Sequence, residues 1–141
     1  MGRNELRIVI GLHRMVNEID RKTGRLLQPY HLTLGQFAVL EALYHKGDMT
    51  IGQVQEKILS SSGTIPLIIQ NLEKRKLLRR LKNEKDRRVC MLQLSEEGRW
   101  LIEEVYPKNE AMIFRELGIY SPEEQEELVR LFKKYKEEQD G

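Results

Sequence analysis

Two capping boxes mark helix starts in the middle of the chain and restrict its fold more than any other sequence feature. Thr33 with Gln36, and Thr50 with Gln53, have the spacing at which each side chain satisfies the other residue's free backbone N–H. Apolar residues follow at helical spacing: Phe37, Leu40, Leu43 and Tyr44 after the first box, and Ile51, Val54 and Ile58 after the second. The sequence therefore predicts a helix and then a short helix that runs into a tight turn at 60–63.

A third helix is predicted directly after this turn. Its apolar residues have the spacing of a helix packed along one face: Ile65, Ile68, Ile69 and Leu72. Proline lacks a backbone N–H and is tolerated in the first turn of a helix, so Pro66 places the N-cap between Ser62 and Thr64. The opposite face has no role in a core and carries Gly63, Leu67, Gln70 and Lys74, with Asn71 on its flank.

A short β-hairpin with a charged tip follows. Residues 77–81 and 89–94 are β-compatible runs that bracket a polar segment. Residues 74–88 carry nine basic and two acidic side chains, whereas residues 95–141 carry seven basic and thirteen acidic ones. The net charge of +2 therefore conceals a basic block, which is typical of a nucleic-acid contact but also consistent with a solvated surface.

Helices are predicted on both sides of this central segment. Leu6, Val9, Ile10, Met15, Val16 and Ile19 recur at helical spacing and predict a helix that ends near Gly24. Further helix starts are marked by Ser95 with Glu96 and Glu97, and by Ser121 with Pro122 and Glu124. We expect residues 1–141 to form a single domain, mainly α-helical with a small β-hairpin.

The order helix, short helix, turn, helix and basic hairpin is that of a winged helix-turn-helix. In this fold the second helix of the motif lies in the major groove of DNA, and the hairpin, or wing, reaches the neighbouring minor groove. The residues expected to contact DNA are Ser61, Ser62, Thr64, Leu67, Gln70, Asn71 and Lys74 from the turn and helix, and Lys82, Lys85, Asp86, Arg87 and Arg88 from the wing. The alternatives are an ordinary exposed helix face and, for Asp86, a surface ion pair.

Three segments resemble the DNA-binding core of the MarR family of transcriptional regulators: LTLGQFAVLEAL, TIGQVQEKILSSSGTIPLIIQNLEKRKLL and KDRRVCMLQLSEEGR. The match covers about residues 32–99, and its wing signature is Asp-x-Arg followed by a strand and Leu-Ser-x-x-Gly. The resemblance implies that Arg88 enters the minor groove and that Asp86 holds the wing arginines in place. It also implies that helices over about 4–28 and 96–137 intertwine with a second subunit, with a winged helix-turn-helix lobe at 32–95 between them.

The resemblance further implies a cytoplasmic regulator, most often a repressor, that binds a pseudo-palindromic operator in double-stranded DNA as a homodimer. Members respond to small amphipathic or phenolic effectors bound between the dimer helices and the DNA-binding lobe. The sequence offers four residues for such an effector site: His13, Tyr30, His31 and Phe37.

The sequence departs from the family where base readout is expected. Many members have a polar pair such as Thr-Arg where this chain has Pro66 and Leu67, so an arginine contact to guanine is not carried over. Leu67 is expected to meet a thymine methyl instead, and Gln70 to pair with adenine. Lys76 stands where members commonly have glycine, which requires a different helix exit or a left-handed lysine.

Other classes of function find little support in the sequence. His13, His31 and His45 are far apart and have no acidic or cysteine partner at ligand spacing, so neither a metal nor a cofactor is expected. No acid–base cluster or nucleophile motif indicates an enzyme. The single Cys90 excludes an intramolecular disulfide, and no apolar run approaches the roughly 18 residues of a membrane helix. The remaining rival is a winged-helix module that binds a protein and not DNA.

Overall fold

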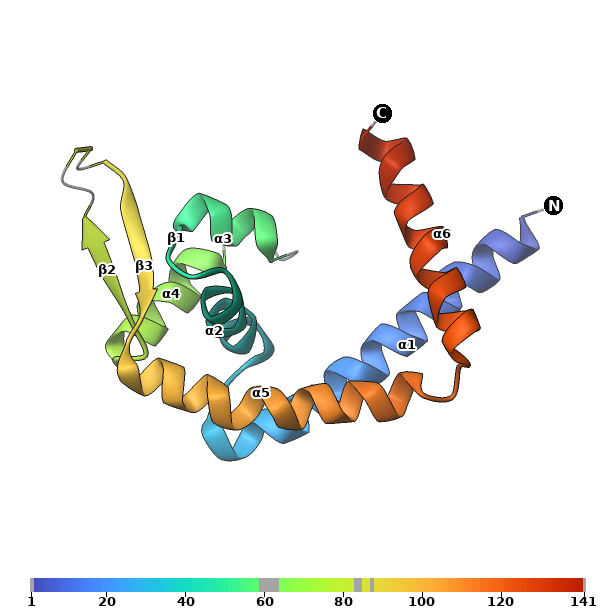
Figure 1. Ribbon diagram of the computed structural model, residues 1–141, viewed down its shortest axis with the longest axis horizontal. Helices are drawn as coiled ribbons and strands as arrows, with labels where there is room; N and C mark the ends of the chain where they lie inside the picture. Colours follow the sequence, from blue (N-terminus) through green and yellow to red (C-terminus); the bar gives the residue numbers. More distant parts are fainter. Residues whose placement is uncertain (1, 59–63, 83–84, 87, 141) are drawn as a thin grey trace.

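The computed structural model describes residues 2–58, 64–82, 85–86 and 88–140 (Figure 1). The α-helices are α1 Arg3–Leu27, α2 Leu34–Lys46, α3 Ile51–Lys57, α4 Ile65–Lys74, α5 Glu96–Leu117 and α6 Pro122–Asp140. The remaining elements are the 3-10 turn η1 Gln28–Tyr30 and the strands β1 Met49–Thr50, β2 Leu78–Lys82 and β3 Cys90–Leu94. The predicted class, mainly α with a small β wing, is confirmed.

Both predicted capping boxes are present. Thr33 N donates to Gln36 Oε1 at 2.9 Å and Gln36 N donates to Thr33 Oγ1 at 3.1 Å; the corresponding distances for Thr50 and Gln53 are 2.8 and 3.1 Å. The apolar faces that begin at these caps form one core together with α4, α5 and the sheet. Its fully buried side chains include Leu40, Leu43, Val54, Ile65, Ile69, Leu72, Leu92 and Ile102.

The sheet contains one strand more than the predicted hairpin. Its order is β1-β3-β2 with antiparallel neighbours, and Met49 pairs with Leu92 while Leu78 pairs with Leu94. The strand β1 is two residues long and ends where the cap of α3 begins, so no sequence period marks it. Its pairing fixes the start of α3 to the base of the wing.

The long helix α5 joins this lobe to the arm formed by α1 and α6 (Figure 1). The α1–α5 contact contains a buried hydrogen bond from Thr23 Oγ1 to Asn109 Oδ1 at 2.7 Å and an ion pair between Lys22 and Glu116. The prediction that the first helix ends near Gly24 was wrong, because α1 continues to Leu27. A helical glycine costs only about 1 kcal/mol, and Thr23 and Leu27 on either side of it are buried.

The Leu-Ser-x-x-Gly segment fixes the start of α5 to the exit of α4. Ser95 Oγ accepts a hydrogen bond from Gly98 N at 3.0 Å and donates one to Lys76 O at 2.6 Å. A Cβ on Gly98 would lie 1.9 Å from Leu77 O, so only glycine fits this contact. This segment therefore sets the geometry between α4 and α5.

Candidate nucleic-acid interface

The helix α4 divides sharply into a core face and a solvent face. Ile65, Ile69 and Leu72 are fully buried. The side chains predicted for DNA lie on the other face, where Thr64, Leu67, Gln70 and Lys74 are exposed and Leu67 retains 58% of its accessible surface. Asn71 is half-buried on the flank. Leu67 therefore contributes nothing to the hydrophobic core of its own chain and lies beside the amide of Gln70 and the ammonium of Lys74 on the exposed face.

The end of α4 has the left-handed geometry considered above for Lys76. Lys76 has a φ of 61°, its N–H donates to Glu73 O at 2.9 Å, and Leu77 N donates to Leu72 O at 3.0 Å. These two bonds form a Schellman motif, in which glycine is the usual left-handed residue. The end of α4 therefore has the usual Schellman geometry, with a lysine in place of glycine at the left-handed position.

The base of the wing is tied to α4 by charge. Arg80 on β2 lies 3.2 Å from the Glu73 carboxylate, measured from Nε to Oε1. Lys82, the last residue of β2, is exposed. The Arg80–Glu73 pair was missed in the sequence because its partners lie on different elements, on either side of the turn at Lys76.

The described part of the wing tip contains an arginine held by an aspartate. Asp86 Oδ1 accepts hydrogen bonds from the backbone N of Arg88 at 3.0 Å and from its side-chain Nε at 3.2 Å. The Arg88 side chain nevertheless keeps 92% of its accessible surface. Lys85 beside it is exposed. Three predicted contact residues, Ser61, Ser62 and Arg87, lie outside the described residues.

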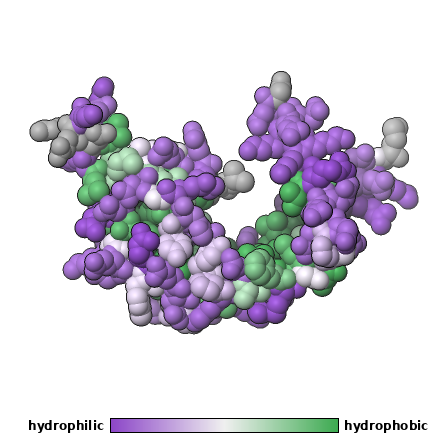
Figure 2. Space-filling model, viewed as in Figure 1, coloured by the Kyte–Doolittle hydropathy of each residue, from purple (hydrophilic) through white to green (hydrophobic). Residues whose placement is uncertain are grey.

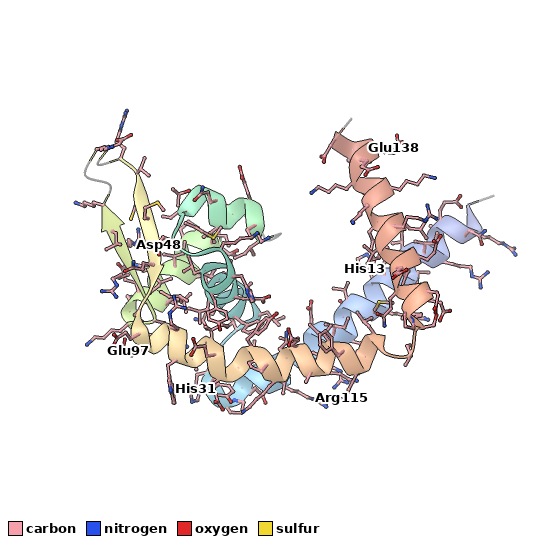
Figure 3. The ribbon with its side chains drawn as sticks, in the orientation of Figure 1. His13, His31, Asp48, Glu97, Arg115 and Glu138 are labelled. Carbon is pink, nitrogen blue, oxygen red and sulfur yellow. The ribbon has the colours of Figure 1, made fainter. Side chains whose placement is uncertain are left out.

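Of the four residues suggested for an effector site, His13 lies apart from the other three. His13 is exposed on α1, and about 1.5 Å of rise per residue places it roughly 20 Å from the end of that helix. Phe37 is buried in the core of the lobe. Tyr30 and His31 lie at the turn between α1 and α2, and Figure 3 shows His13 and His31 well apart.

A hollow of about 500 Å³ lies between α2 and the end of α3. It is lined by Ala38, Glu41, Ala42, His45, Lys46, Lys57 and Ile58. Burial raises the pKa of the Glu41 carboxyl, and the neighbouring His45 and Lys57 oppose this rise. None of the four sequence candidates lines this hollow.

The described part of the chain contains neither a metal-binding cluster nor a membrane-spanning helix. No three His, Cys, Asp or Glu side chains among those residues come together in a way that would hold a metal ion. No helix in the same residues is long and apolar enough to cross a membrane.

Comparison with known proteins identifies the family. A family model for the transcriptional regulators SarA and Rot matches residues 21–105. The HTH-type transcriptional regulator MhqR of Bacillus subtilis is 34% identical over 134 residues, which are 95% of this chain and 92% of MhqR. The structure of a MarR family protein from Bacillus stearothermophilus is similar to this one, with a TM-score of 0.77 and 25% sequence identity. The similarity covers 100% of this chain and 99% of that chain. The chain belongs to the MarR family.

This MarR-family protein is thus a DNA-binding transcriptional regulator of the winged-helix type. It also resembles BpsR of Bordetella bronchiseptica, with a TM-score of 0.79, 29% identity and 89% of both chains covered. BpsR is described as a protein whose DNA binding is regulated by 6-hydroxynicotinic acid. The relatives named here are regulators and not enzymes.

Proposed function

We propose that this MarR-family regulator acts in the cytoplasm as a ligand-responsive repressor, binding a pseudo-palindromic DNA operator as a homodimer. The observation that carries the proposal is the pairing of a solvent-facing α4 with a wing whose Arg88 is oriented by Asp86. The two elements lie side by side, since β2 packs against α4 and the wing extends beyond it (Figure 1).

The exposed face of α4 supports readout of the major groove. Leu67 offers an apolar contact to a thymine methyl, and Gln70, one turn further on, has the amide that pairs with adenine. Thr64 and Lys74 are exposed near the two ends of α4 and are suited to phosphate contacts. Base preference is therefore expected to rest on Leu67 and Gln70.

The wing supports readout of the minor groove. A narrow minor groove has an enhanced negative potential that attracts an inserted arginine. The guanidinium of Arg88 is nearly fully exposed, while its Nε and backbone N are both held by one carboxylate oxygen of Asp86. Lys82 and Lys85 add positive charge along the same hairpin and are assigned to phosphates.

The exposed hydrophobic residues of the arm support a homodimer. On α1 they are Leu6, Ile8, Val9, Ile10, Leu12 and Val16, and on α6 they are Val129, Leu131, Phe132 and Tyr135. None of the residues of α6, which is described throughout, is buried within its own chain. Figure 2 shows hydrophobic surface along the inner side of this arm. Contiguous apolar surface of this kind marks an interface, and a second copy of the chain supplies a matching one.

An effector is assigned to the hollow between α2 and α3. The hollow adjoins the helix-turn-helix, so a bound molecule there would displace α3 relative to α2. BpsR, whose DNA binding responds to 6-hydroxynicotinic acid, is a relative with the same fold. A small aromatic acid is therefore the first class of ligand to test.

Selection of bound duplexes from a random pool, followed by anisotropy titration, tests the DNA contact. Arg88→Ala is expected to weaken binding to the selected duplex by about tenfold or more. Lys85→Ala is expected to weaken selected and scrambled duplexes alike and to lower the salt slope by about one. The control is Arg115→Ala, since Arg115 lies on α5 far from the wing (Figure 3).

Normal binding by Arg88→Ala would contradict the assignment of the wing. If the wild-type protein shows no salt-sensitive DNA binding at all, the winged-helix protein-interaction module becomes the better account.

Sedimentation at micromolar concentration tests the homodimer. The expected particle has twice the 16.7 kDa mass of one chain. Val9→Glu places a charge in the exposed stripe of α1 and is expected to shift the protein towards monomer. Trp100→Glu is the control, because Trp100 is also an exposed hydrophobic residue, at 73%, but lies at the wing end of α5. A folded wild-type monomer would contradict the interface.

A further inference from the structure

Arg75 belongs to the basic block but is engaged with the protein's own backbone. It is the C-cap residue of α4. Its Nη1 donates to His31 O at 2.7 Å and its Nη2 donates to Tyr30 O at 3.0 Å. Two nitrogens of one guanidinium thus bridge successive carbonyls at the turn between α1 and α2. No local pattern in the sequence indicates this contact, because it joins residues more than forty positions apart.

These carbonyls are suited to receive a positive charge. They follow the C-terminal end of α1 and η1, where backbone carbonyls lack helical partners and the helix dipole is negative. His31 N donates to Gln28 O at 3.0 Å, and the φ of His31 is 55°, so this turn is closed in the left-handed region like the exit of α4. Arg75 therefore connects two chain reversals of fixed geometry.

The turn between α1 and α2 is also held to α5. The phenol of Tyr30 accepts a hydrogen bond from Lys108 and donates one to Glu104 Oε1 at 3.4 Å. Lys108 Nζ also lies 3.2 Å from Glu104 Oε1, and these partners raise the pKa of Lys108. The contacts of Arg75 thus reach α5 through Tyr30, at a point separate from the Ser95 contact with Lys76.

We infer that Arg75 is a positioning residue that fixes the orientation of the recognition helix α4 relative to α1 and α5. The inference rests on the proposed DNA-binding function. In a dimer, the spacing of the two α4 helices has to match the spacing of the operator half-sites. Without the bridge, α4 keeps its base-contacting side chains and its buried face, but its C-terminal end loses the contact with the turn between α1 and α2.

The location of the bridge agrees with this role. Figure 3 shows His31 beside α5, on the side of the lobe away from the wing tip. A phosphate contact would require the guanidinium to face DNA, whereas two of its nitrogens are committed to carbonyls on this side. Lysine does not replace it, because its single ammonium lacks the planar fork.

Anisotropy titrations of the selected duplex and of a scrambled duplex of equal length test the inference. Arg75→Lys keeps the charge and removes the fork. We expect its affinity for the selected duplex to fall about tenfold, with scrambled-duplex affinity within about twofold of wild type and an unchanged salt slope. Arg25→Lys makes the same change at an exposed residue in the last turn of α1 and is expected to bind both duplexes normally.

Two results would overturn the inference. In the first, Arg75→Lys binds like wild type while Arg75→Gln weakens both duplexes and lowers the salt slope by about one, which identifies a phosphate ligand. In the second, Arg75→Lys lowers the melting temperature but leaves the ratio of selected to scrambled affinity unchanged, which identifies a purely structural contact. A wild-type protein that selects no duplex overturns the proposed function as well, so the two failures are distinguishable.

Discussion

Gly98→Ala is expected to destabilise the protein through one specific contact. The added Cβ would lie 1.9 Å from Leu77 O and 3.2 Å from Leu94 Cδ2. A carbon and a carbonyl oxygen approach to about 3.3 Å at best, so α5 or the exit of α4 has to move by more than an ångström. Leu77 O also accepts a hydrogen bond from Ser95 N at 3.2 Å, which the same movement strains.

The magnitude follows from the rigidity of both partners. Overpacking in a well-packed core costs about 1–3 kcal/mol, and a clash with backbone belongs at the upper end of that range. About 3 kcal/mol corresponds to a fall in melting temperature of roughly 6–12 °C for a domain of this size.

Thermal melts at one fixed protein concentration measure this effect. Gly24→Ala is the matched control, because Gly24 lies within α1 and no atom outside its own helix backbone and chain neighbours lies within 4 Å of the added Cβ. It is expected to gain about 0.5–1 kcal/mol, since alanine is the better helix former. Equal melting temperatures for Gly98→Ala and Gly24→Ala would contradict the close approach of α5 to Leu77.

Three further predictions concern stability. Lys76→Gly removes the strain of a lysine with left-handed backbone geometry and should raise the free energy of unfolding by about 0.5 kcal/mol in urea titrations. A lower free energy of unfolding would argue against that backbone geometry. Thr33→Ala should cost about 1 kcal/mol by the same titration while Thr33→Ser stays near wild type, and equal behaviour would contradict the cap. Burial raises the pKa of the Glu41 carboxyl, so the protonated side chain favours the folded state at low pH. This contribution to the free energy of unfolding is lost as pH rises through the folded-state pKa. Glu41→Gln should therefore gain in melting temperature relative to wild type as the pH rises above about 4.3, the ordinary pKa of a glutamate, and a difference independent of pH would refute this.

The elements that could be predicted from the sequence are those with a local signal. The capping boxes at Thr33 and Thr50 fixed two helix starts, and Pro66 fixed a third, because the hydrogen bonds involved lie within one helical turn. The exposed face of α4 followed from helical spacing once its apolar side was known. The left-handed exit at Lys76 was one of two alternatives in the sequence, and the structure decides between them.

The features that were missed depend on contacts between distant residues. The end of α1 was misplaced at Gly24 because the gain from packing Leu27 is not visible in the local sequence. The strand β1 exists only through its pairing with β3, and Arg75 finds its carbonyls across the fold. The hollow between α2 and α3 is likewise formed by residues that the fold brings together, and the effector candidates His13, Tyr30, His31 and Phe37 stay a prediction.

Hydroxyl-radical footprinting of the selected duplex tests the central claim most directly, because it reports which deoxyriboses along the DNA backbone and its minor groove the protein covers. Two recognition helices and two wings of a symmetric dimer predict two matching protected regions with centres about 10 base pairs apart, each flanked by minor-groove protection that is lost in Arg88→Ala. A single asymmetric footprint, or a symmetric one that Arg88→Ala leaves intact, would contradict the account.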